Sequence, residues 1–216
     1  TSVDKANLLK GKKISIQAPG SIDQYLFGRA AEKAGLDPTK DLNWSSGMSY
    51  PDMIKLMGVG QADAANIPVP LAFLAEKNKA GKIIGAGSDI EPNAQLACWV
   101  MSSKFLAESK SAAVRFAMVH THAARLFNKA AAAKDPDVIK IVSEATKVPA
   151  PLIERAAPRW TWFDEKGMPN VESCLAQGKF WNQIKLVNAT VSQQQLFDLS
   201  PAKEADDRLS KSNPFT

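Results

Sequence analysis

The chain has 216 residues, of which 45% are hydrophobic and 23% are charged. This composition is ordinary for a globular protein and supplies apolar surface for one domain or two small lobes. The net charge is +5, but the lysines are scattered and no basic stretch is interleaved with aromatic residues, which argues against nucleic acid as a partner. The sequence has no run of about 18 apolar residues, so it predicts no membrane-spanning helix.

Strands and helices alternate through the first part of the sequence. The stretch "KISIQ" alternates and is rich in isoleucine, which is typical of a strand. Apolar residues at positions 22, 26, 30 and 34 share one face of the helix that follows. The pattern predicts strands at 13–17, 41–46, 62–67 and 82–87, and helices at 21–35, 51–60 and 68–81. Short connections between them indicate an α/β fold with a parallel sheet.

The second part is mostly helical. A polar connector leads to one more predicted strand at 96–101, "LACWVM", and helices are then predicted around 105 and at 111–133, 135–147, 149–157 and 171–187. The polar tail from 192 is expected to be loosely held. We therefore expect an α/β part at 9–95, a hinge strand with a helical part at 96–191, and a tail at 192–216.

The turn Pro19-Gly20-Ser21 joins the first strand to its helix. Ser21 and Gln24 have the spacing of a capping box, and a cap alone would make Ser21→Ala cost about 1 kcal/mol of stability. A binding role is the alternative. Ligands of parallel α/β sheets lie beyond the carboxyl ends of the strands, where helix starts favour anions.

Two further turns lead to the same sheet edge. The segment "WSSGMSYPD" follows the second strand and offers Tyr50. The segment "NIPVP" follows the third strand and offers Asn66 and a helix start at Pro68. Because the carboxyl ends of parallel strands meet at one edge, the three turns are expected to converge.

These segments resemble the periplasmic solute-binding proteins of ABC importers, in the nitrate, taurine and alkanesulfonate branch that also includes binders of thiamine-pyrimidine precursors. The resemblance rests on the "LKGKK" start of the first strand, the "PGS" turn with "AGL" after its helix, the "GQADAA" strand and the "SSKFLAE" helix start, and it covers most of residues 9–128.

The resemblance implies a type II periplasmic binding fold: a parallel-sheet lobe, then a mostly helical portion of the other lobe, closing on a ligand about hinge strands. It implies a periplasmic or extracellular binding protein without enzymatic activity or cofactor, which captures a small anion of the sulfonate, carboxylate or nitrate class for a membrane permease. The ligand-binding residues would be Gly20, Ser21, Ile22, Tyr50, Asn66 and Pro68.

Members of that family usually begin with a first-lobe segment, whereas this sequence begins where the second lobe starts. We therefore expect either a fragment or a partner, such as a second copy, that supplies the rest. Apolar residues on the long helix would need such a cover, namely Phe116, Val119, Ala123, Leu126 and Phe127.

Three alternatives stay open: an enzyme resembling the pyrimidine synthase of this fold, which uses iron and its own histidine, an effector-binding regulatory module, and a folded fragment without activity. His120 and His122 lie two apart on a helix, a spacing that argues against a metal pair.

Cys98 and Cys174 could pair or stay free. Trp160, Trp162 and Phe163 either pack a turn or line a cleft in which Arg159 pairs with the anion, and Trp99 and Trp181 are expected in the core.

Overall fold

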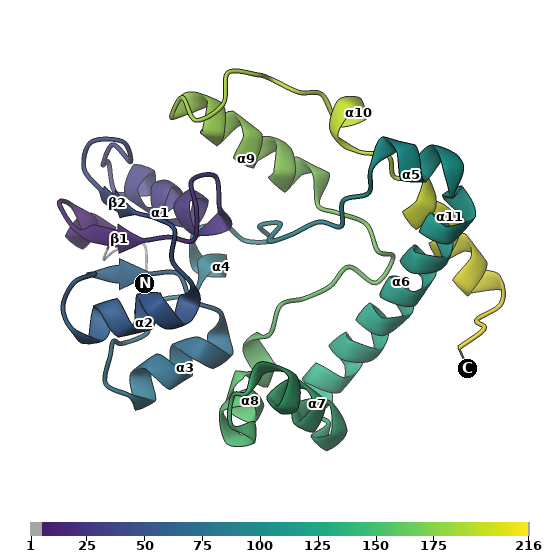
Figure 1. Cartoon of the computed structure of the whole chain (residues 1–216), viewed down its shortest axis with the longest axis horizontal. Helices are drawn as coiled ribbons and strands as arrows, with labels where there is room; N and C mark the ends of the chain where they lie inside the picture. The colour runs from purple at the N-terminus through teal and green to yellow at the C-terminus, as the bar shows by residue number, and fades with distance from the viewer. Residues whose placement is uncertain (1–5, 216) are drawn as a thin grey trace. The chain divides into compact units, whose positions relative to one another are not determined.

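The computed structural model describes residues 6–215, which divide into two compact units (Figure 1). Unit 1 consists of residues up to 96 together with residues 172–191. Unit 2 consists of residues 97–171 and the segment from 192 onward. The α/β unit therefore includes a returning segment, 172–191, in addition to the residues around its sheet.

Unit 1 is built on a three-stranded parallel sheet in the order β2-β1-β3. Ile14 at the centre pairs with Trp44 on one side and with Ala64 on the other. The strands are β1 (Lys13–Ser15), β2 (Asn43–Ser45) and β3 (Ala64–Ala65), and the helices are η1 (Ala6–Leu9), α1 (Ile22–Lys33), α2 (Tyr50–Gly58), α3 (Val69–Lys77), α4 (Gly87–Ile90) and α9 (Val171–Gln183). This confirms the predicted α/β class with a parallel sheet followed by a mostly helical portion.

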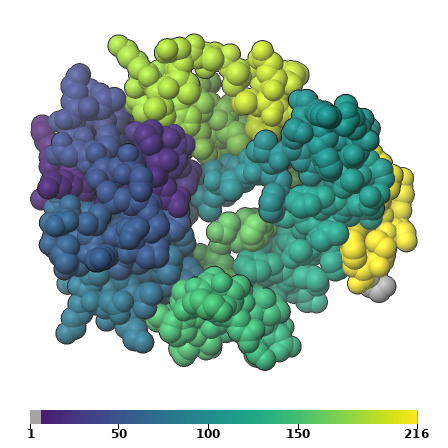
Figure 2. Space-filling view, in the orientation of Figure 1, coloured from purple at the N-terminus to yellow at the C-terminus, as the bar shows by residue number. Residues whose placement is uncertain are grey.

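Helix α1 packs on the sheet with one face and on α9 with another. Ile14 and Ile16 of the first strand segment are fully buried and belong to one apolar cluster with Ala30 and Ala31 of α1. On the other face of α1, Tyr25 meets the ring of Phe180 on α9, with ring centroids 5.4 Å apart. In the space-filling view the sheet and helices α1 to α3, coloured purple to blue, form one continuous body (Figure 2).

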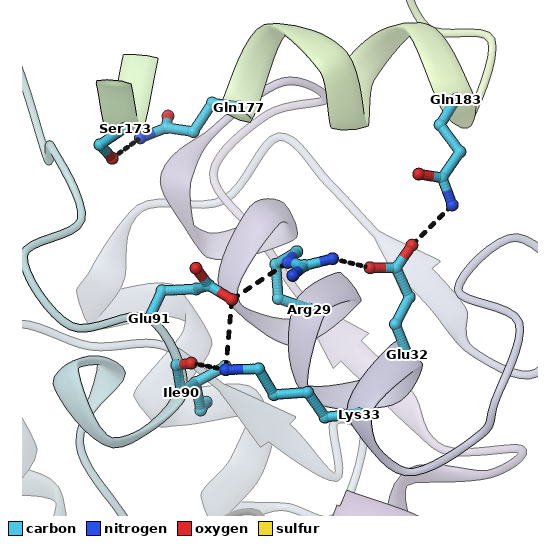
Figure 3. A network of polar contacts seen from close by, with 8 residues as sticks. All are labelled: Arg29, Glu32, Lys33, Ile90, Glu91, Ser173, Gln177 and Gln183. Atoms are coloured by element: carbon cyan, nitrogen blue, oxygen red, sulfur yellow. Dashed lines mark hydrogen bonds and ion pairs between the residues drawn. The ribbon is translucent and has the colours of Figure 1, made fainter. Parts of the chain in front are cut away.

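A polar network also fastens α9 and the segment after α4 to α1 (Figure 3). Arg29 pairs with Glu32 on its own helix and donates through Nε to Glu91, 3.0 Å away. Gln183 of α9 donates to the other oxygen of Glu32, at 2.7 Å. Lys33 reaches Glu91 at 3.3 Å. The network holds both segments against one face of α1.

Two predicted strands are wrong. Residues 82–86 and 96–101 form neither helix nor strand, and Gly87 already belongs to α4. Trp99 and Val100 are 66% and 89% exposed. An apolar run becomes a strand only when a neighbouring strand pairs with its backbone groups. Within residues 6–215 neither segment has such a partner. Trp99 consequently lies outside the core, contrary to the prediction.

Unit 2 is helical and organised around the 24-residue helix α6. Its helices are α5 (Ser103–Glu108), α6 (Lys110–Ala133), α7 (Pro136–Thr146), α8 (Ala150–Ala156), η2 (Ala157–Arg159), α10 (Gln193–Leu196) and α11 (Ser200–Lys211). One face of α6 stays open, since Phe116, Val119 and Leu126 are 40%, 55% and 56% exposed.

No helix in residues 6–215 is both long and apolar enough to cross a bilayer.

The C-terminal segment differs from the loosely held tail that the sequence predicts. Helix α11 packs along α6, and Ala205 and Leu209 are buried there. Asp206 accepts from Arg125 of α6 at 2.7 Å. The polar composition hid this helix, because only one residue in four, at 201, 205 and 209, faces the neighbour.

Candidate functional site

The candidate site is the edge of the sheet beyond the carboxyl ends of β1 and β3. Gln17 follows β1, Tyr50 begins α2 and Asn66 follows β3. Asp23, in the first turn of α1, accepts hydrogen bonds from Gln17 and Asn66, and Tyr50 joins them through Gln17. The side chain of Asp23 is fully buried. All four residues belong to unit 1.

Asp23 joins the turn after β1 to the turn after β3. Its Oδ2 accepts from the backbone N–H of Gln17 at 3.2 Å, and its Oδ1 accepts from Nδ2 of Asn66 at 2.9 Å. Hydrogen bonds that involve a charged acceptor are roughly twice as strong as neutral ones. The carboxylate therefore fixes Asn66, which is half-buried, against the start of α1.

Tyr50 completes the network from the side of α2. Its hydroxyl donates to Oε1 of Gln17 at 3.0 Å. Burial, and then the negative charge of Asp23, raise the pKa of Tyr50 above its usual value. Around neutral pH the phenol therefore stays protonated and can keep this hydrogen bond.

Ser21 occupies the N-cap position of α1 but does not cap the helix. No amide donates to its side chain, and its Oγ is buried without a hydrogen-bond partner in the described structure. The prediction that the Ser21 side chain caps the helix, which is one half of the expected capping box, is therefore wrong. Gln24 does reach back, but its Oε1 accepts from the N–H of Gly20, at 2.9 Å. Two acceptors of the first turn, Asp23 and Gln24, thus hold the preceding turn without the hydroxyl.

The remaining predicted residues lie near the same turn but differ in what they contact. Gly20 has a φ of +82°, which only glycine adopts easily, and Leu186 lies beside it, 3.4 Å from where a Cβ would stand. Ile22 packs into the apolar cluster of Tyr25 and Phe180. Pro68 is exposed at the N-cap of α3. The structure brings Tyr50 and Asn66 to the β1–α1 turn as predicted.

Sequence reasoning missed Asp23 and Gln17. An acidic residue in the first turn of a helix is a common stabilising feature, so Asp23 looked unexceptional. Its signal was the combination of that position with a sheet edge at which polar side chains from other turns were already expected. Its complete burial depends on contacts made by residues far along the chain, and the local sequence does not encode it.

The aromatic segment after η2 packs against α6. Trp160 stacks on Phe127 with ring centroids 5.0 Å apart, and Phe163 meets the same ring edge-on at 5.4 Å. Asn128 donates to the carbonyl of Phe163 at 2.7 Å and accepts from its N–H at 3.2 Å. These contacts favour the packing role for Trp160 and Phe163, whereas Trp162 is 68% exposed.

The cysteines and the possible metal ligands are the other reactive side chains of the chain. Neither Cys98 nor Cys174 forms a disulfide within residues 6–215. Across residues 6–215, no three His, Cys, Asp or Glu side chains gather in a way that could hold a metal ion. His120 instead accepts at Nδ1 from the indole N–H of Trp99, 3.1 Å away.

Comparisons with known proteins give one family and one fold. A sequence model of the NMT1-like family matches residues 2–143. The crystal structure of a ligand-binding component of an ABC-type import system from Staphylococcus aureus, with zinc bound, superposes with a TM-score of 0.76 at 18% sequence identity. The match covers 91% of this chain and 64% of that one, so the chain spans less than two thirds of its structural neighbour. None of the curated proteins matches.

Proposed function

Because the chain belongs to the NMT1-like family, we propose that it acts as the solute-binding component of an ABC importer, outside the cytoplasmic membrane and together with a membrane permease. The fold supports this role, since the Staphylococcus aureus neighbour is a ligand-binding component of such a system. The role is capture and delivery of a solute, without chemical change.

The ligand we propose is a small anion of the sulfonate, carboxylate or nitrate class. Helices α1 and α2 each place an acidic residue in their first turn, Asp23 and Asp52, whereas α3 has none. No side chain among residues 6–215 caps α3, so the first-turn amides of Val69 and Leu71 have no partner within the helix. A helix start with free amides and no acid in its own first turn favours an anion.

The binding residues would be those around this helix start and the neighbouring turn. Asn66 and Pro68 flank the start of α3, Tyr50 lies on the adjoining turn, and Gly20, Ser21 and Ile22 form the start of α1. The observation that carries the proposal is the hydrogen-bond network in which Asp23 holds Gln17 and Asn66 while Gln17 holds Tyr50, so that three separate turns meet.

Isothermal titration with ethanesulfonate, acetate and nitrate tests the proposal, preceded by native mass spectrometry to detect a retained solute. We expect one-to-one binding of at least one anion, weakened about fivefold by Asn66→Leu, because this change removes the hydrogen bond, worth about 1 kcal/mol, that holds the turn before α3 on Asp23. Asn78→Leu is the matched control, since Asn78 is exposed at the opposite end of α3. Equal affinities in both variants, or no binding of any anion, would contradict the proposal.

A further inference from the structure

Resting on the proposed function, we infer that the site also reads a hydrogen-bond donor on its ligand through Oδ1 of Asn66. The ligand is then a small anion that carries an O–H or N–H group next to its charged end. The inference rests on the way in which buried Asp23 fixes the direction of the Asn66 amide.

The carboxylate of Asp23 determines which end of the Asn66 amide faces it. A carboxylate offers only acceptor oxygens, so whatever side chain approaches it must present a donor. Both oxygens of Asp23 are engaged, one by the N–H of Gln17 and one by Nδ2 of Asn66. The side chain is fully buried, so water does not compete for these bonds.

The hydrogen bond from Nδ2 to Asp23 also determines where Oδ1 of Asn66 points. With Nδ2 held toward Asp23 at 2.9 Å, Oδ1 must point away from the carboxylate. Asn66 is only half-buried, and the structure gives Oδ1 no protein donor among residues 6–215. The exposed end of this amide is therefore an acceptor, and a ligand satisfies it only with an O–H or N–H group.

The hydroxyl oxygen of Tyr50 is a second acceptor at this site. Because the Tyr50 proton is committed to Oε1 of Gln17, its oxygen offers lone pairs to a ligand. Two acceptors, the hydroxyl oxygen of Tyr50 and Oδ1 of Asn66, thus lie beside the β1–α1 turn. Free backbone amides lie at the start of α3. Complementarity to this arrangement requires a ligand with negative charge at one end and a donor beside it.

The test compares 2-hydroxyethanesulfonate with 2-methoxyethanesulfonate, in which a methyl group replaces the hydroxyl hydrogen. We expect the wild-type protein to bind the hydroxyl compound about tenfold more tightly, because the methyl ether leaves Oδ1 of Asn66 unpaired. Equal affinity for the two probes overturns the inference and leaves the proposed function standing. Binding of neither probe contradicts the proposed function instead.

The variant Asp23→Asn sharpens the test. Its carbonyl oxygen can keep the N–H of Gln17, so its NH₂ group faces Asn66 and turns that amide over. The preference for the hydroxyl probe should then vanish or reverse. Asp52→Asn, which removes the same charge from the start of α2, should keep it. A preference retained in Asp23→Asn overturns the inference.

A readout without ligand covers the remaining cases. In the wild-type protein the Asn66 side-chain NH₂ should exchange slowly with water in NMR spectra, and it should exchange fast in Asp23→Asn. Fast exchange in the wild-type protein overturns the inference, whatever the probes do. If Asp23→Asn does not fold, Asn66→Leu replaces it, and this variant should bind both probes with equal, weakened affinity.

Discussion

The ring of Phe180 rests directly on Gly28: a Cβ at position 28 would stand only 2.2 Å from Cζ of Phe180. This approach joins α9 to the middle of α1, and Tyr25 frames the same ring at an interplanar angle of 82°. A helix-interior glycine normally weakens its helix, so the close contact explains why the sequence has one here. Packing of α9 on α1 therefore depends on the absence of a side chain.

Gly28→Ala should lower the free energy of unfolding by about 1–3 kcal/mol, because overpacking outweighs the better helix propensity of alanine. Gly178→Ala is the matched control, since no atom of the described residues lies within 4 Å of a Cβ at that position of α9. That change should raise stability by about 0.5–1 kcal/mol. Urea unfolding measures both, and two gains of equal size would refute the contact.

Ser21→Ala should leave stability unchanged or raise it by about 1 kcal/mol, because a buried hydroxyl without a partner is a cost. Ser49→Ala provides the contrast, since Ser49 does cap α2 by accepting from the N–H of Asp52. That variant should lose about 1 kcal/mol. The comparison is made by thermal and chemical denaturation. A loss at Ser21 equal to that at Ser49 would restore the capping role.

The sequence was most informative where local chemistry decides the structure. Helix α7 begins after Asp135, which accepts from the N–H of Asp137 and Val138, and α1, α2 and α3 follow predicted turns. It failed where pairing decides. "LACWVM" has the composition of a strand, yet no strand in residues 6–215 pairs with it. Composition also concealed α11, of which only Pro201, Ala205 and Leu209 are buried.

The site shows the same division. The convergence of Tyr50 and Asn66 on the turn after β1 follows from parallel topology and was predictable. The hub of the network, the buried Asp23, was not, because its contacts with Gln17 and Asn66 form only when the turns after β1 and β3 meet. The direction of the Asn66 amide, on which ligand selectivity depends in our proposal, follows from that hub.

Both tyrosines should ionise above pH 10, their usual pKa. Burial and then the charge of Glu91 raise the pKa of Tyr25, and burial and then the charge of Asp23 raise that of Tyr50. A raised pKa in the folded state gives stability that is complete below about pH 10 and is lost as the pH rises through the folded value. Unfolding followed across alkaline pH by phenolate absorbance should show this decline.

Tyr50→Phe separates the two contributions. The variant should lose part of the alkaline decline and keep the part due to Tyr25, since the two phenols lie in different contacts. It also removes the hydrogen bond to Gln17, so a small loss of stability at neutral pH is expected. A titration in which either phenol ionises below pH 10 would be incompatible with this account.

His120 should make unit 2 less stable in acid. Burial lowers the pKa of its imidazole, and the neutral ring accepts at Nδ1 from the indole of Trp99. A lowered pKa in the folded state means that stability is complete above about pH 6.5 and is lost as the pH falls through the folded value. NMR titration of the ring and Trp fluorescence check this. His120→Phe should remove this part of the pH dependence, and an unaltered profile would exclude His120 as its source.

Leu209→Ala should cost about 2–4 kcal/mol, because Leu209 is 5% exposed and packs in the interface of α11 with α6. Ser210→Ala, one residue further along the same helix and exposed, should stay within about 0.5 kcal/mol of the wild type. The ion pair of Arg125 with Asp206 lies beside the interface but is partly solvated, so Asp206→Asn should cost less than Leu209→Ala. Chemical denaturation followed by circular dichroism measures all three. Equal, small effects for Leu209→Ala and Ser210→Ala would mean that α11 is not held on α6, and that the segment behaves as the loose tail its composition suggests.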